Sequence, residues 1–143
     1  MFKHLLIPTD GSEASQRALQ RGVELAKALG ASVTLMTAVE HPGALRGLAV
    51  QASDNPMHQA AQAAALHWLE EAQASVAHWG VSVVCVVGEH QSIYQSILET
   101  ARTSGADLIV MGTHGAGALE RLLVGSQTQR VLAHTTIPVL VLH

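Results

Sequence analysis

The 143-residue sequence is poor in cysteine, aromatic residues and charge. Its single cysteine, Cys85, excludes an intramolecular disulfide bond. Lys and Arg number 8 against 11 Asp and Glu, giving a net charge of −3 without a basic cluster, so we expect no nucleic-acid-binding surface. The apolar stretch near the N-terminus is too short for a signal sequence or a membrane span, and we therefore expect a soluble, cytoplasmic protein.

Familiar catalytic and metal-binding patterns are also missing. The chain has no Gly-x-Ser-x-Gly elbow of a Ser-His-Asp hydrolase and no Gly-x4-Gly-Lys-Ser/Thr phosphate loop. It has 9 histidines, but none has partners at zinc-ligand spacing, and His67 and His78 are three helical turns apart. With only Asp10, Glu89 and Glu120 as candidate carboxylates, we expect no catalytic residues and at most slow hydrolysis of a phosphate ligand.

The most informative feature that is present is a glycine pattern near the C-terminus. Gly112-Thr113-His114-Gly115 follows an apolar run and precedes Gly125-Ser126 by nine residues. Glycines allow a backbone to approach an anion closely, and a helix beginning at Ser126 would direct its unpaired N–H groups at the same point. The pattern predicts a phosphate site for a nucleotide. The plainer alternative is two tight turns and a helix cap.

Apolar runs alternate with helical periodicity along the chain, which is typical of an α/β fold with a mainly parallel sheet. We expect one domain, a long loop over 41–56, and an N-cap at Asp10 or Ser12. Trp68 and Trp79 share one face of a predicted helix and are interpreted as core residues. The predicted strands are 4–7, 32–39, 81–87, 107–111 and 138–142, and the predicted helices end at Gly30, Gly80, Gly105 and His134.

The last predicted strand begins with Pro138, which favours an edge position in the sheet. An apolar edge strand tends to associate unless something pairs with it. We therefore expect a homodimer in which the 138–142 strands of two copies meet. The alternative is a short edge covered by its own side chains.

Taken together, these motifs resemble the universal stress protein family along essentially the whole chain. The matching segments are Pro8-Thr9-Asp10-Gly11-Ser12, Val87-Gly88-Glu89, the glycine pattern with Gly125-Ser126, and Ile137-Pro138-Val139-Leu140-Val141. The glycine spacing is similar to that of the ATP-binding branch of the family. Two positions differ from the family's usual pattern, His90 and Gln127, and both bear on nucleotide preference.

The resemblance implies a three-layer fold, like that of the adenine nucleotide alpha hydrolases, with a five-stranded parallel sheet of order 3-2-1-4-5. It implies dimerisation through the last strand and ATP, with ADP and AMP as alternatives, bound with Mg²⁺ or Mn²⁺ bridging the phosphates. Base and ribose would contact Pro8, Thr9, Asp10, Ala38, Met111 and Gly112; the phosphates would contact His114, Gly115, Gly125, Ser126, Gln127 and Thr128.

The function that follows from the resemblance is a nucleotide-responsive homodimeric regulator of stress responses, acting on a protein partner that the sequence does not identify. His114 either polarises a phosphate or is simply a hydrogen-bonding loop residue, and the second role is favoured. A nucleotide-independent interaction protein of the same fold is the alternative function.

Overall fold

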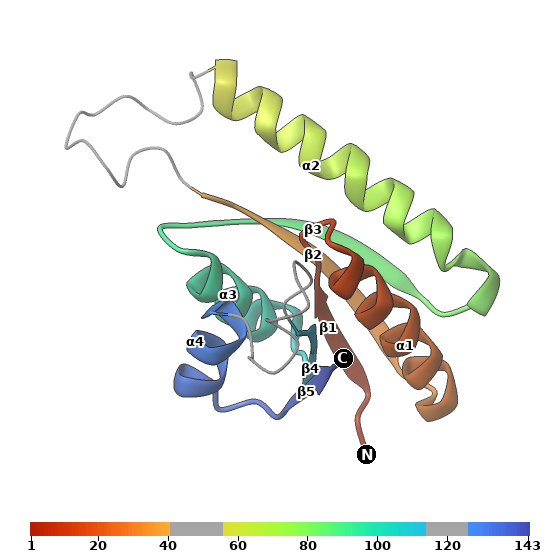
Figure 1. Cartoon of the computed structure of the whole chain (residues 1–143). Coiled ribbons are helices and arrows are strands. Elements are labelled where there is room, and N and C mark those ends of the chain that lie inside the picture. The colour runs from red at the N-terminus through yellow and green to blue at the C-terminus, as the bar shows by residue number, and fades with distance from the viewer. Residues whose placement is uncertain (41–55, 114–125) are drawn as a thin grey trace.

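A computed structural model describes residues 1–40, 56–113 and 126–143 (Figure 1). Its five strands form one all-parallel sheet in the order β3-β2-β1-β4-β5, which confirms the predicted fold and strand order. In the described residues the strands are β1 His4–Pro8, β2 Ser32–Glu40, β3 Val83–His90, β4 Leu108–Gly112 and β5 Val139–Leu142, and the helices are α1 Glu13–Leu29, α2 Pro56–Ser75, α3 Ile93–Ser104 and α4 Ser126–His134, with a 3-10 turn, η3, at Ala77–Trp79.

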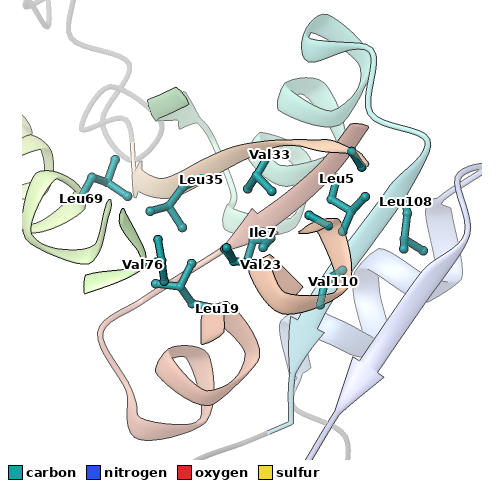
Figure 2. Close-up of a cluster of buried hydrophobic side chains, with 12 residues drawn as sticks. Leu5, Ile7, Leu19, Val23, Val33, Leu35, Leu69, Val76, Leu108 and Val110 are labelled. Carbon is teal, nitrogen blue, oxygen red and sulfur yellow. The ribbon is translucent and has the colours of Figure 1, made fainter. Parts of the chain in front are cut away.

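Helices cover both faces of the sheet (Figure 1). Successive side chains of a strand point to opposite faces, so β1 contributes to two cores. Leu5 and Ile7 pack with α1 and α2 residues in one core, shown in Figure 2. Leu6 packs in the other core with Ile97 of α3 and Val131 of α4. Burial on both faces of the sheet therefore explains why Leu5, Leu6 and Ile7 of the central strand β1 are all apolar.

Helix α1 begins and ends where the sequence predicts. Ser12 is the N-cap, and its hydroxyl accepts a hydrogen bond from the Ser15 backbone N–H, which would otherwise lack a partner. Asp10, the other candidate cap, instead accepts from the Ser12 backbone N–H at 2.9 Å. Gly30 ends the helix in the left-handed region, at φ 68°, as expected of a C-terminal glycine. The cap fixes the direction in which the chain leaves β1.

The predicted helix ending at Gly80 is wrong in its last turn. Helix α2 ends at Ser75, and Trp79 lies in the separate 3-10 turn η3. Both tryptophans nevertheless pack against the core on the α1 and α2 face, which confirms their interpretation as core residues. The helix also begins at Pro56, one residue inside the predicted loop; residues 41–55 of that loop lie outside the described part of the chain.

Strand β3 is an edge strand and is only partly buried, although its apolar sequence is typical of a buried strand. It begins at Val83 and continues through His90, beyond the predicted end at Val87. The side chain of Val84 is 57% exposed, and Cys85 is half-buried. Burial and a neighbouring glutamate, Glu70, raise the pKa of the Cys85 thiol, so the thiol stays protonated at neutral pH.

At the opposite edge of the sheet lies β5, which confirms the predicted edge position of the last strand. Its four residues are half-buried and pair with β4. No helix in the described ranges, 1–40, 56–113 and 126–143, is long and apolar enough to cross a membrane.

Candidate functional site

A cavity lies at the carboxyl ends of β1, β2 and β4, the edge at which open α/β sheets bind ligands. Its volume of about 460 Å³ is within the range of small-molecule sites. Nine of the predicted site residues line it: Pro8, Thr9, Asp10, Ala38, Met111, Gly112, Ser126, Gln127 and Thr128. The other three, His114, Gly115 and Gly125, lie outside the described residues.

Sequence reasoning missed part of the wall. The missed residues come from the first turn of α1, the ends of β2 and β4, and one side of α3: Ser12, Glu13, Ser15, Met36, Thr37, Ile93, Ile97 and Thr113. Met36 and Ile97 are buried apolar residues, so this side of the cavity offers a dry surface to a planar group. No local signal could have indicated Met36 and Thr37, which lie in the middle of β2, or the residues of α3, which carries no motif.

The β1–α1 turn places a carboxylate in the cavity. Burial alone would raise the pKa of Asp10, but hydrogen bonds from Ser12 and Ser15 outweigh it and hold the pKa below its usual value. Asp10 is therefore ionised at neutral pH and accepts hydrogen bonds without donating any. The side chain beside it, Thr9, is buried and donates its hydroxyl hydrogen to Ser15 Oγ at 3.1 Å.

Helix α1 lies so close to Gly112 that there is no room for a side chain at this position. A Cβ atom at this position would lie 2.7 Å from the carbonyl oxygen of Ala14 and 3.0 Å from its carbonyl carbon. The backbone of β4 and the first turn of α1 are therefore in direct contact. The first glycine of the motif allows this packing, whereas the sequence interpretation had assigned it to the approach of an anion.

Helix α4 begins at the cavity, as predicted. Its first residues, Ser126, Gln127 and Thr128, all line the cavity. Thr128 is buried and donates to the Gly112 carbonyl oxygen at 3.4 Å, which ties the helix to the end of β4. The Oε1 atom of Gln127 is enclosed and has no hydrogen-bond partner among residues 1–40, 56–113 and 126–143. The helix start thus combines backbone donors with one acceptor that lacks a donor.

Comparison with known proteins identifies the family. The sequence model of the universal stress protein family matches residues 1–143. The chain belongs to this family. Among curated members, universal stress protein MJ0531 of Methanocaldococcus jannaschii is 33% identical over 141 residues, covering 99% of this chain and 82% of the relative. The family resemblance seen in the motifs is therefore confirmed over the full length.

Solved universal stress proteins have the same fold. UspA from Lactobacillus plantarum superimposes with a TM-score of 0.80 at 26% identity, covering 99% of this chain and 97% of the other. A universal stress protein in complex with cAMP has a TM-score of 0.71 at 25% identity, covering 99% and 97%. At least one relative of the same fold therefore binds an adenine nucleotide.

Metal ligands are not gathered anywhere in ranges 1–40, 56–113 and 126–143: no group of three His, Cys, Asp or Glu side chains has the geometry to hold an ion. His67 is 3.3 Å from Glu71 on the exposed side of α2, while His78 lies in η3. A Mg²⁺ or Mn²⁺ ion at this site would therefore be held mainly by phosphate oxygens and water.

Proposed function

We propose that this universal stress protein binds an adenine nucleotide, ATP, ADP or AMP, in the cavity at the carboxyl edge of its sheet. The observation that carries the proposal is that nine residues implied by the family resemblance, from three strands, the β1–α1 connection and the start of α4, line one cavity of about 460 Å³. The cAMP complex of a relative with the same fold supports the adenine part of the ligand.

The cavity offers a suitable surface to each part of such a ligand. The apolar side formed by Met36, Ala38 and Ile97 suits the flat adenine ring. Ionised Asp10 is an acceptor for the ribose hydroxyls. The hydroxyl of Ser126, with the N–H groups at the start of α4, is a donor for phosphate oxygens. No step of this arrangement requires hydrolysis, and we propose slow turnover at most.

The first experiment is to denature freshly purified protein and identify any released nucleotide by chromatography and mass spectrometry. Ala38→Trp would fill the adenine side of the cavity, and Ala28→Trp, on the exposed side of α1, is the matched control. We expect nucleotide from the wild type and from Ala28→Trp, and none from Ala38→Trp. Circular dichroism verifies that both variants are folded.

If no sample releases nucleotide, the next experiment is calorimetry of the wild type with added Mg-ATP and with AMP. If the wild type ignored both, the binding proposal would be wrong, and the nucleotide-independent interaction protein would become the better account. Self-association of Ala38→Trp then provides a second test, because a nucleotide-independent interaction protein should associate with itself as the wild type does even when the cavity is filled.

We also propose that the protein acts in the cytoplasm as a homodimeric regulator of stress responses, pairing through β5. The support is the position of β5 at the sheet edge with half-buried apolar residues. Nucleotide binding next to β4, the strand on which β5 lies, would bias the conformers that a protein partner meets.

A further inference from the structure

A second cavity lies between helices α1 and α2. Helix α1 packs mainly over β1 and β4, and α2 over β2 and β3, so the two helices leave a groove between them on the face of the sheet that they share (Figure 1). The groove has a volume of about 420 Å³, which is within the range of small-molecule sites. Gln20 of α1 donates to Ser75 Oγ of α2 at 3.4 Å across it. We call this cavity the α1–α2 groove.

Part of the lining of this groove is apolar and is fixed in place by the core. The Leu19 side chain is 1% exposed, and Trp68 and Ala72 pack against the same core cluster. The Trp68 ring is also held by the β1–α1 turn, because a Cβ atom at Gly11 would lie 2.9 Å from its Cζ2 atom. Trp68 is only half-buried, so the groove presents a firmly held aromatic side chain to a ligand. Such a surface suits a flat apolar ring.

The charged side chains in the described lining of the groove are exposed, and each has a partner. Glu13 contacts Arg17 at 2.9 Å, and Glu71 contacts His67 at 3.3 Å. All four side chains are at least 50% exposed, so water and salt weaken their electrostatic effect. A charge on a ligand would therefore gain little from these groups. The apolar surface that the ligand buries is then the main source of its affinity.

We propose that the α1–α2 groove binds a flat aromatic amphiphile, whose ring system packs against Leu19, Trp68 and Ala72 and whose polar end remains in water. This site is distinct from the cavity at the carboxyl edge of the sheet. Within the described ranges, 1–40, 56–113 and 126–143, the two linings have only Thr9 and Glu13 in common. The inference therefore goes beyond the proposed function and does not depend on nucleotide binding.

The test measures the indole N–H signals in a nitrogen-15 NMR spectrum, because the chain has 2 tryptophans. Trp68 lies in the groove, whereas the Trp79 ring has the Nζ atom of Lys27, in the last turn of α1, 5.5 Å from its centre. We expect the probe 2-naphthylmethanol to shift the Trp68 signal until it saturates and to leave the Trp79 signal unchanged. Benzyl alcohol should bind about tenfold more weakly, because its single ring buries roughly 55 Å² less apolar surface.

Two charged analogues of the probe, 2-naphthoate and 2-naphthylmethylammonium, test whether the ring or the charge determines binding. Both should bind within about threefold of the alcohol at low salt, because the exposed, paired side chains attract neither sign of charge strongly. A preference of about tenfold or more for one charged analogue would overturn the inference, since the groove would then be a site for that ion. Equal binding of benzyl alcohol and 2-naphthylmethanol would also overturn it, as would a Trp68 signal that does not move at the solubility limit of the probe.

Blocking variants locate the bound probe. Ala72→Phe fills the groove from α2, and Ala74→Phe, at an exposed position of α2, is the matched control. Because Ala72 is half-buried, Gln16→Phe provides a second block from an exposed position of α1. We expect both blocks to weaken probe binding at least about tenfold and Ala74→Phe to leave it unchanged. Ala38→Phe, which fills the other cavity without adding a tryptophan, should bind the probe as the wild type does. Loss of binding in Ala38→Phe, with binding kept in both blocked variants, would place the probe at the carboxyl edge and overturn the inference.

Discussion

Replacement of Gly112 by alanine separates the packing role of this glycine from a role in ligand binding. The added Cβ would lie 2.7 Å and 3.0 Å from the carbonyl oxygen and carbon of Ala14, and 3.4 Å from the Ser15 nitrogen. Ordinary contacts between such atoms are about 3.5–4.0 Å, so the first turn of α1 and the end of β4 must move apart by roughly 0.5–1 Å. These atoms belong to backbone, which cannot rotate away as a side chain can.

Overpacking of this kind costs about 1–3 kcal/mol in the free energy of unfolding. With a urea dependence of about 2 kcal/mol per molar, typical of small proteins, the midpoint should fall by roughly 0.5–1.5 M. The assay is urea unfolding of ligand-free protein followed by circular dichroism. Because Ala14 and Ser15 are buried below the β1–α1 turn, adenine nucleotide binding should weaken as well.

Gly105→Ala is the control, because Gly105 has φ 70° but no atom within 4 Å of an added Cβ. It should lose only the left-handed backbone preference, about 1 kcal/mol. If Gly112→Ala unfolded at the wild-type urea midpoint while binding was lost, the packing argument would be refuted. The glycine would then serve the ligand, as the sequence pattern alone suggested.

Three further predictions follow from the described contacts. Leu69→Ala should lower the free energy of unfolding by about 2–5 kcal/mol and expose Trp68 to water, seen as a red shift in fluorescence, because Leu69 is the one fully buried apolar anchor of α2. Val141→Pro should give a monomer in light scattering with unchanged unfolding. The carbonyls of Pro138 and Leu142 accept hydrogen bonds from β4, and backbone groups of successive residues alternate between the two edges of a strand, so the Val141 N–H, one residue from Leu142, points to the open edge. The Lys3 and His4 backbone N–H groups donate to the Asp107 carboxylate and hold its pKa below the usual range. The stability that Asp107 contributes is therefore present above a pH of about 4 and is lost as the pH falls through the lowered pKa. In Asp107→Asn, the free energy of unfolding should therefore depend less on pH in this acidic range.

Much of the fold and most of the site could be predicted because strand ends in a parallel sheet converge. An apolar run such as 108–111 signals a strand buried on both faces, and the residue after it must lie at the carboxyl edge. Apolar composition does not distinguish a central from an edge strand, however. Val83 to Val87 are as apolar as β4 because α2 and α3 both pack against β3, yet β3 is an edge strand, since within the described structure it pairs with β2 alone.

One error of the sequence analysis has a local physical cause, and two have long-range causes. The helical spacing of Ala72, Val76 and Trp79 extends beyond the end of α2. The reason is that the 3-10 turn η3 keeps Val76 buried and Trp79 packed against the core, as a longer helix would. The apolar wall from Ile93 and Ile97 depends on how α3 lies across the sheet, a long-range arrangement without a local signal. The contact between Gly112 and Ala14 is likewise invisible in sequence, because the two residues are far apart in the chain.

The β1–α1 turn makes folding and binding depend on the same few atoms. Ser12 caps α1 and donates its N–H to Asp10, while Gly11, at φ 81°, packs so closely that an added Cβ would lie 2.9 Å from the Trp68 ring. A change within this turn therefore alters three features at once: helix α1, the packing of α2 against the turn, and the Asp10 acceptor in the cavity.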